Sequence, residues 1–277
     1  MMKSKTEYVY LFFVCFSLCA SCTGRNQTGE STYTTPETED FSGIMGREIE
    51  SVIRSVREGN AADFASLCRY PIERDYPLHD VIDSCDMVAR YAEIFDAEIT
   101  DSVSTSAAED WGCVNWRGYT FGNGEYLWLD DAIYRIPYHS KLEKKRREQL
   151  IQEDLASLPS ALSDGWFPEL CLLDTVSETV YRLDVREPDS NVTECRLMAY
   201  DKDENLKSIP SLILIGHKEL QGSAGITCYI FPRGCGTEWA ICNLWPENQI
   251  SFQTDQKDGK FESHNLKKIY WLDLISS

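Results

Sequence analysis

The stretch LCLLDTVSETVYRLDV, residues 170–185, decides the fold of this chain, because two short apolar runs flank a turn there. Runs of the same kind continue towards the C-terminus, separated by turn residues at intervals of about ten residues. They are ECRLMAY, SLILIG, GITCYIF, EWAICNLW, ISFQT and KIYWLDLI. This pattern predicts a mostly antiparallel β-sandwich or barrel-like domain over residues 166–277.

Residues 46–138 predict an α+β module in which helices come before a small antiparallel sheet. Apolar residues recur at helical spacing in its first part, and Asn60 can cap a short second helix. Asp83 or Ser84 can cap a third helix, whose single apolar stripe runs on to Ile99. We therefore expect the N-terminal helices to pack on the sheet that follows them.

Three segments of strand composition follow these helices. WGCVNWRGYTF and EYLWLDD flank GNG, residues 122–124, which is a sound hairpin turn because Gly and Asn tolerate positive φ. AIYRIPYH supplies the third strand. The module is therefore expected to end at residue 138.

A charged segment, residues 139–165, is predicted to link the module to the β-rich domain. Ser140 can start a helix there, KLEKKRREQLIQEDLASL, whose apolar stripe is thin. A charge run of this kind favours a solvated connecting helix. The alternative is a docking helix for an acidic partner.

The N-terminal segment predicts where the protein works. Lys3 and Lys5 precede an apolar run shorter than the roughly 20 residues of a bilayer span, so residues 1–21 are expected to be a secretory signal peptide. Its ending, LCASC, resembles the lipobox of bacterial lipoproteins, in which a cysteine after small residues is acylated, as with palmitate, and becomes the mature N-terminus. The resemblance implies lipidation of Cys22, with Cys19 as an alternative acceptor, while an ordinary signal peptide is the rival interpretation.

Residues 22–45 are rich in Thr, Gly, Ser and Glu, a composition typical of a flexible tether. The protein would then be anchored to a membrane by its lipid without spanning it. We expect it in the bacterial cell envelope, at the outer membrane in preference to the inner one.

Composition excludes one class of partner. Hydrophobic residues make up 43% and aromatic residues 12% of the chain, which is enough to build cores. The formal net charge is −18, whereas nucleic-acid binding needs a basic surface. Nucleic acid is therefore not an expected partner, and the acidity is explained most simply by solubility.

Aromatic residues cluster in the predicted sheet. Tyr126 and Trp128 share one face of the expected strand 125–129, and Trp116 lies in the strand segment before it. Aromatic rings offer large flat surfaces with a polar tip, so these three residues are candidates for binding a glycan or a peptide. The alternative is that both faces of the sheet are covered, as is usual for a sheet that is apolar on both.

Eight cysteines follow Cys22, and an extracytoplasmic compartment permits disulfides. Cys68 and Cys85 could pair across the Tyr-Pro loop between them, with Cys113 as a third candidate. Cys171, Cys228 and Cys242 fit buried strand positions as small apolar side chains, although Cys235 could pair with Cys242 across a hairpin. The spacing of the cysteines and histidines does not fit a zinc site, and Cys235 has no local histidine as a base. Neither a metal nor a cofactor is therefore expected.

Two longer segments carry a second resemblance. FASLCRYPI, MVARYAEIFDAEI and WRGYTFGNGEYLWL resemble a module of bacterial envelope proteins near the NTF2-like or cystatin-like α+β folds, in which a helix packs on a curved sheet. RLMAYDKDENLKSIPSLILIGHKELQGSAGITCYIF is similar to the β-rich tail often fused to that module. No catalytic residue is carried over, because these proteins have none assigned.

These observations favour a cell-envelope lipoprotein that acts as a non-catalytic binding or assembly module for a protein or glycan partner. A hydrolase acting on envelope or extracellular polymers is the first alternative, since Asp110 and Asp174 lie near aromatic residues as glycosidase carboxylates often do. An inhibitor or immunity-type protein is the second alternative, because the acidity would suit a basic secreted effector.

Overall fold

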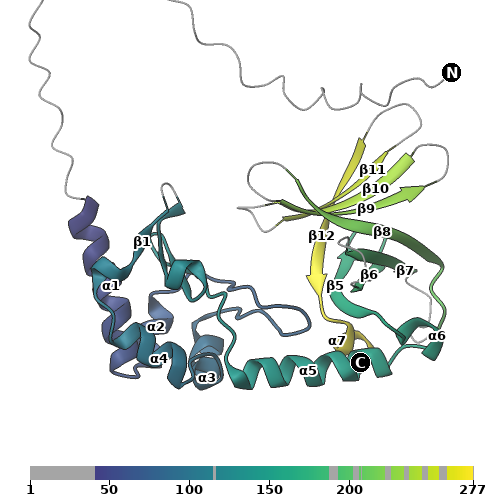
Figure 1. Ribbon diagram of the computed structural model, residues 1–277. Coiled ribbons are helices and arrows are strands. Elements are labelled where there is room, and N and C mark those ends of the chain that lie inside the picture. The colour runs from purple at the N-terminus through teal and green to yellow at the C-terminus, as the bar shows by residue number, and fades with distance from the viewer. Residues whose placement is uncertain are drawn as a thin grey trace, which may run out of the picture. The chain divides into compact units, whose positions relative to one another are not determined.

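Helices and barrel strands occupy different parts of the chain (Figure 1). The computed structural model describes residues 41–276, apart from gaps at 115–116, 187–192, 202–205, 207, 222–225, 234–236, 245–248 and 256–260. Ser42–Ser277 form one compact unit. Cys22, the predicted signal peptide and nearly all of the predicted tether lie outside the described residues.

Predicted caps start three of the helices. The Asn60 and Asp83 side chains accept hydrogen bonds from backbone N–H groups of α2 and α3, and the Ser140 hydroxyl does the same for α5. The first helix begins at Phe41, inside the segment predicted as tether. The described α-helices are α1 (Phe41–Arg57), α2 (Ala61–Ser66), α3 (Ser84–Ile94), α4 (Ala97–Ser104), α5 (Lys141–Ala156), α6 (Ser160–Ser163) and α7 (Trp271–Ser276).

The prediction of one continuous third helix was wrong, because the chain breaks between α3 and α4. The Asp96 side chain caps α4 by accepting hydrogen bonds from the N–H groups of Glu98 and Ile99. An N-cap residue needs non-helical dihedral angles, so a capping Asp inside an apolar stripe ends one helix and starts another. Both helices still contribute to one core, in which Ile94 and Ile99 have no exposed surface.

A small sheet follows the helices, as predicted. Its strands pair antiparallel in chain order, and the turn at residues 122–124 joins the second strand to the third. Asn123 in this turn has φ 54°, which suits Asn. Leu127 and Leu129 point into the core that the helices share. The four strands are β1 (Gly112–Cys113), β2 (Tyr119–Phe121), β3 (Leu127–Leu129) and β4 (Ile133–Arg135).

The C-terminal part is a closed antiparallel barrel, so the α+β fold class is confirmed and the barrel is the form that the β-rich domain takes. Each of its eight described strands pairs with the next one along the chain, and the last pairs with the first. These are β5 (Phe167–Asp174), β6 (Thr179–Arg186), β7 (Glu194–Tyr200), β8 (Leu212–Gln221), β9 (Ile226–Arg233), β10 (Thr237–Leu244), β11 (Gln249–Asp255) and β12 (Phe261–Ile269).

Side chains fill the inside of this barrel. Inward residues alternate with outward ones along each strand, and an eight-stranded barrel has an interior just wide enough for its own side chains or one small ligand. Gly216 allows a close approach of β8 and β9, since a Cβ there would collide with the Ile230 carbonyl. The buried members of the inner cluster are Leu172, Tyr181, Leu183, Cys195, Leu197, Ala199, Tyr229, Phe231, Ile241 and Leu266.

The outer wall of β5–β7 is also covered, and this fastens α5 to the barrel. Cys171, Met198 and Tyr200 lie on that wall in one cluster with Leu158 and Trp271 from the helical segments. Most residues of α5 are exposed, as expected of a solvated connecting helix, but Glu143, Ile151 and Asp154 are buried. Two of its charged side chains are buried in ion pairs, Glu143 with Arg74 and Asp154 with Arg182.

Candidate functional site

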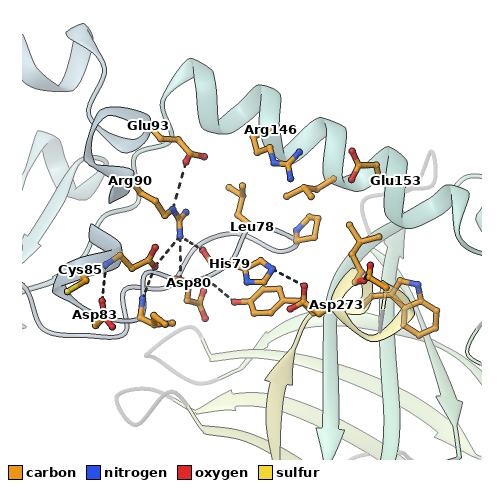
Figure 2. Close-up of a pocket in the computed structure, with 18 residues that line it drawn as sticks. Leu78, His79, Asp80, Asp83, Cys85, Arg90, Glu93, Arg146, Glu153 and Asp273 are labelled. Atoms are coloured by element: carbon orange, nitrogen blue, oxygen red, sulfur yellow. Dashed lines mark hydrogen bonds and ion pairs between the residues drawn. The ribbon is translucent and has the colours of Figure 1, made fainter. Parts of the chain in front are cut away.

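A cleft of about 730 Å³ lies where the loop before α3 meets α5 and α7 (Figure 2). Its floor is apolar: Leu78 and Trp271 are buried there, while Leu150 and Leu272 are half-buried. Charged side chains from all three segments form the rim. A concave site with an apolar floor and a few polar groups is the usual form of a binding site.

Stacked rings form one wall of the cleft. The His79 imidazole lies against the Tyr270 ring with the ring centres 3.9 Å apart, and Tyr76 continues the stack behind Tyr270. The Asp80 N–H donates a hydrogen bond to the Tyr270 hydroxyl, which holds the polar end of this ring in place. The His79 side chain is 53% exposed and approaches Asp273 to 3.5 Å. The wall therefore presents a flat aromatic surface beside a carboxylate.

Arg90 lies in the cleft, but its charge is already used within the protein. Its guanidinium donates to the His79 carbonyl at 2.8 Å and lies within 4 Å of carboxylate oxygens of Asp86, Glu93 and Glu143. A guanidinium has five N–H donors, and most of these are directed at fixed partners here. Arg90 thus joins α3, α5 and the loop, and leaves little charge for a ligand.

Two carboxylates of the rim are directed at solvent. Glu153 of α5 is exposed and forms no ion pair with the other described residues. Asp273 of α7 is 59% exposed and contacts only His79 among the ion-pair partners that the structure describes. Arg146 is exposed on α5 between these groups and Glu93 (Figure 2). The rim therefore has mixed charge, and its carboxylates are the less engaged groups.

A salt bridge holds the loop that lines the cleft. Arg74 and Glu143 form an ion pair with no exposed side-chain surface, and Arg74 also donates to the Tyr138 carbonyl at 2.8 Å. Lys268 of β12 donates to the Asp80 carboxylate at 2.7 Å and to the Arg74 carbonyl at 3.2 Å. The loop is thus fastened to α5 on one side and to the barrel on the other.

A second buried charge network lies beneath the floor. Arg182 of β6 pairs with Asp154 of α5 and with Asp184, which in turn binds Arg196. Burial disfavours a charge at Arg182, but Asp184 and Asp154 outweigh it and raise the pKa of Arg182 above its ordinary value. The guanidinium lies 5.0 Å from the Trp271 ring. This network positions the floor of the cleft on the barrel wall.

The cleft holds a thiol and an imidazole that do not contact each other. Cys85 is exposed in the first turn of α3, whereas the contacts of His79 are with Tyr270 and Asp273. A nucleophilic cysteine needs a base within hydrogen-bond distance, about 2.6–3.2 Å. Among the described residues no hydrogen bond joins Cys85 to a base. Cys85 and His79 therefore do not form a nucleophile–base pair in this arrangement.

The predicted aromatic residues lie elsewhere, in the small sheet. Trp116 lies outside the described residues, and Tyr126 precedes β3, so the two remaining rings do not share a strand face as expected. Tyr126 packs against Tyr138 with ring centres 5.3 Å apart, whereas Trp128 packs edge-on against Tyr134 at 6.3 Å. Both rings are half-buried. A glycan or peptide groove at this sheet stays a prediction.

The turn glycines explain where these two rings lie. A Cβ at Gly122 would collide with the Tyr126 ring, and one at Gly124 would press on the Trp128 ring. The Trp128 indole N–H also donates to the Gly124 carbonyl at 2.8 Å. The rings therefore cover the turn of the hairpin, a local packing role that the alternation of residues does not reveal.

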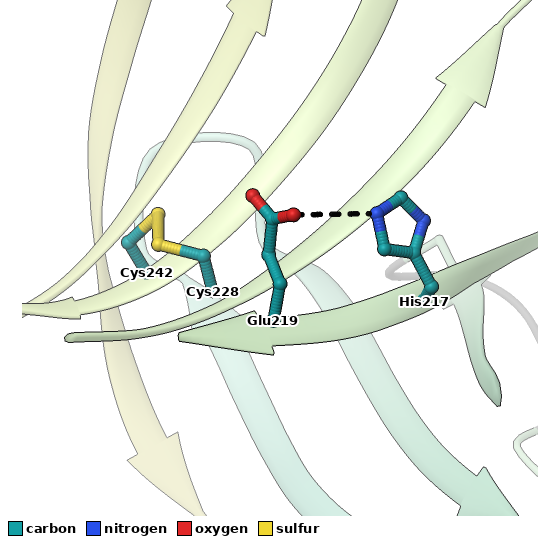
Figure 3. The surroundings of a disulfide bond; sticks show 4 residues. All are labelled: His217, Glu219, Cys228 and Cys242. Carbon is teal, nitrogen blue, oxygen red and sulfur yellow. Dashed lines mark ion pairs between the residues drawn. A yellow bond between two sulfur atoms is a disulfide. The ribbon is translucent and has the colours of Figure 1, made fainter. Parts of the chain in front are cut away.

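The structure contains a disulfide between Cys228 and Cys242, on β9 and β10 (Figure 3). The two residues face each other directly in the strand register, with Cα atoms 4.3 Å apart. The interpretation of Cys228 and Cys242 as unpaired apolar side chains was wrong, and so was the possible pairing of Cys242 with Cys235, because register opposes Cys228 to Cys242. Cys235 itself lies outside the described residues. His217 and Glu219 form an ion pair of 3.6 Å beside the disulfide.

The expected Cys68–Cys85 pair was also wrong, since both thiols are free. Burial raises the pKa of Cys68 to about 12, although the Tyr70 hydroxyl opposes this. Burial likewise raises the pKa of Cys171 and of Cys195 to about 12. These three thiols therefore stay protonated at neutral pH and behave as small apolar side chains.

The described residues contain neither a metal-binding cluster nor a membrane-spanning helix. They contain no group of three or more His, Cys, Asp or Glu side chains arranged to hold a metal ion. Within the same residues, no helix has the length and apolarity needed to cross a membrane.

Sequence reasoning missed the cleft because its residues come from three distant segments. The prolines of RYPIERDYPLHD, residues 69–80, predict a loop and nothing about its partners. The apolar run that contains Trp271 predicts a last strand, whereas the structure has helix α7 there. One signal was present: His79 and Asp80 closely follow a Tyr-Pro pair in a loop rich in charged residues. Comparison of the chain with protein families, with curated proteins and with solved structures found no match.

Proposed function

We propose that this chain is a cell-envelope lipoprotein that binds a partner in the cleft and does not act on it chemically. The cleft carries the proposal: about 730 Å³ of open space with an apolar floor and a charged rim. Buried ion pairs hold its walls, so the site needs little rearrangement to accept a ligand. Such preorganisation is typical of a binding surface.

The envelope location is supported by two independent features. The N-terminal segment resembles a lipoprotein signal that ends at Cys22. The disulfide between Cys228 and Cys242 suits an exported protein, because disulfides are rare in reducing compartments. Acyl chains on Cys22 would anchor the folded part to a membrane surface.

Labelled palmitate tests the anchor. We expect the full chain produced in a lipoprotein-processing bacterium to incorporate the label and to sediment with membranes. Cys22→Ala should abolish both, whereas the matched variant Cys19→Ala should leave them unchanged. If Cys22→Ala keeps the label and Cys19→Ala loses it, the lipidated residue is Cys19. Absence of label from the unsubstituted chain would contradict lipidation.

Site-specific photocrosslinking in intact cells tests the cleft. A photoreactive amino acid replaces Leu272 in the cleft, Tyr134 beside Trp128 in the small sheet, or Val176 in the turn between β5 and β6 as a control that is 85% exposed. We expect a discrete adduct from position 272 only. An adduct from position 134 alone would favour the aromatic sheet, and equal adducts from all three positions would mean that the cleft is not selective.

A further inference from the structure

We infer that the occupant of the cleft is a cationic polypeptide segment in which Lys or Arg residues are interspersed with apolar ones. This inference rests on the proposed binding function and names the chemistry of its partner. It follows from three properties of the cleft: the balance of charge in its lining, the positions of the least engaged carboxylates and the apolar surface between them.

The lining is acidic even after its own cations are counted. Six carboxylates and two arginines line the cleft, which leaves four negative charges with His79 neutral. Arg90 is held by carboxylates and carbonyls of the protein itself. The chain as a whole carries a formal charge of −18, so its field also attracts a positive partner.

Glu153 and Asp273 are the carboxylates available to a ligand. They project into the cleft from different helices, α5 and α7, and both are exposed (Figure 2). The stacked His79 and Tyr270 rings lie beside Asp273. A guanidinium or ammonium group placed there gains a carboxylate partner, and its alkyl stem can pack on the flat His79 ring.

The carboxylates at the other end of the cleft belong to α3. Asp83 and Asp86 lie in or next to the first turn of that helix, while Glu93 lies in its last turn. Together with Glu153 and Asp273, these residues spread the negative charge of the cleft over α3, α5 and α7. This spread suits a chain that carries several cations better than it suits a single small cation.

Apolar surface lies between the charged groups. Ile82 is 68% exposed at the rim, and Leu150 and Leu272 are half-buried in the floor. A segment that carries cations and apolar residues close together in sequence can place apolar side chains on this floor and cations at the carboxylates. The cleft thus matches a partner of mixed cationic and apolar composition.

Peptide binding to the full purified chain tests this inference. The probe is an amidated peptide of Lys-Leu-Gly repeats, measured by calorimetry at low and high salt. We expect binding that weakens with salt, and an affinity about tenfold lower for the double variant Glu153→Gln/Asp273→Asn, since two charge contacts together are worth roughly 1.4 kcal/mol. The matched control, Glu50→Gln/Glu58→Gln, removes the same charge from exposed positions on α1 and in the turn after it, and should bind like the unsubstituted chain.

Three binding results, and failure of the Lys peptide to bind, would each overturn the inference. The first is an equal loss in both double variants, which would mean attraction by net charge alone. The second is tighter binding of a Glu-Leu-Gly peptide, which would point to Arg146. The third is a dimer that only the Glu153→Gln/Asp273→Asn variant disrupts, which would make a second copy the occupant. If the Lys peptide does not bind but position 272 still crosslinks to a partner in cells, the binding function stands and the cationic occupant is wrong.

Discussion

Asp96 shows how one carboxylate joins three elements. Its side chain caps α4, accepts a hydrogen bond from the Tyr138 hydroxyl at 2.7 Å and accepts another from the Lys141 N–H at the start of α5. Burial opposes its ionisation, but these hydrogen bonds outweigh burial and lower the pKa of Asp96. The charged form is therefore the stabilising one.

Replacing Asp96 should separate capping from charge. Asp96→Ala loses both and should lower the free energy of unfolding by about 1–2 kcal/mol at neutral pH. Asp96→Asn keeps a capping oxygen, so its deficit at neutral pH should be smaller. Because the pKa is lower in the folded state, the contribution of the charge is present above the unfolded pKa, about 3.9, and is lost as the pH falls through the folded value.

Urea unfolding at a series of pH values measures this effect. The difference between the Asp and Asn chains should be largest at neutral pH and shrink in acid. A difference that stays constant down to the acid range would mean that the charge of Asp96 does not matter to folding.

At the scale of elements, α5 depends on buried charges at both ends. Glu143 in its first turn pairs with Arg74, and Asp154 in its last turn pairs with Arg182, all without solvent exposure. A buried ion pair contributes little net stability, but removing one partner leaves an uncompensated charge in the interior. The helix is therefore sensitive to single substitutions.

We expect Arg182→Ala to lower the free energy of unfolding by about 3–5 kcal/mol, because Asp154 and Asp184 would lose their shared partner. The matched control is Arg186→Ala on the same strand, whose side chain is 44% exposed and pairs with Glu194. That change should cost about 1 kcal/mol or less. Equal effects of the two substitutions in thermal unfolding would contradict a structural role for the network.

The hairpin of β9 and β10 should depend on its disulfide. A crosslink that closes a loop of about 15 residues stabilises a fold by roughly 3 kcal/mol in the chain-entropy description, so Cys228→Ser/Cys242→Ser should lower the melting temperature clearly. A reductant should lower it for the unsubstituted chain and leave the double variant unchanged. Cys85→Ser is the control, since that thiol is exposed and free. Insensitivity of the unsubstituted chain to reductant would contradict the pairing.

At the scale of the whole molecule, local signals predicted much of the fold. Capping residues at Asn60 and Ser140, the GNG turn and the spaced apolar runs all act within a few residues, so the sequence shows them directly. The closure of the barrel is different, because the pairing of β12 with β5 joins residues far apart in the chain. Periodicity predicts strands and leaves their partners open.

The candidate site could not be predicted for the same reason. His79, Glu153 and Asp273 belong to segments that meet only after the barrel has closed and α5 has packed on it. The charge run of α5 suggested a solvated helix, since nothing local distinguishes buried Glu143 and Asp154 from their exposed neighbours. The aromatic residues of the small sheet give a stronger local signal, although the Tyr126 and Trp128 rings cover a hairpin turn.

The central claim is that the cleft is where the partner binds. Hydrogen–deuterium exchange of the full chain, with and without the Lys-Leu-Gly peptide, tests it most directly. We expect slower exchange in residues 77–86, 146–153 and 270–276, the segments that supply most of the cleft lining. Slower exchange confined to the small sheet at residues 119–135, with the cleft unchanged, would contradict it.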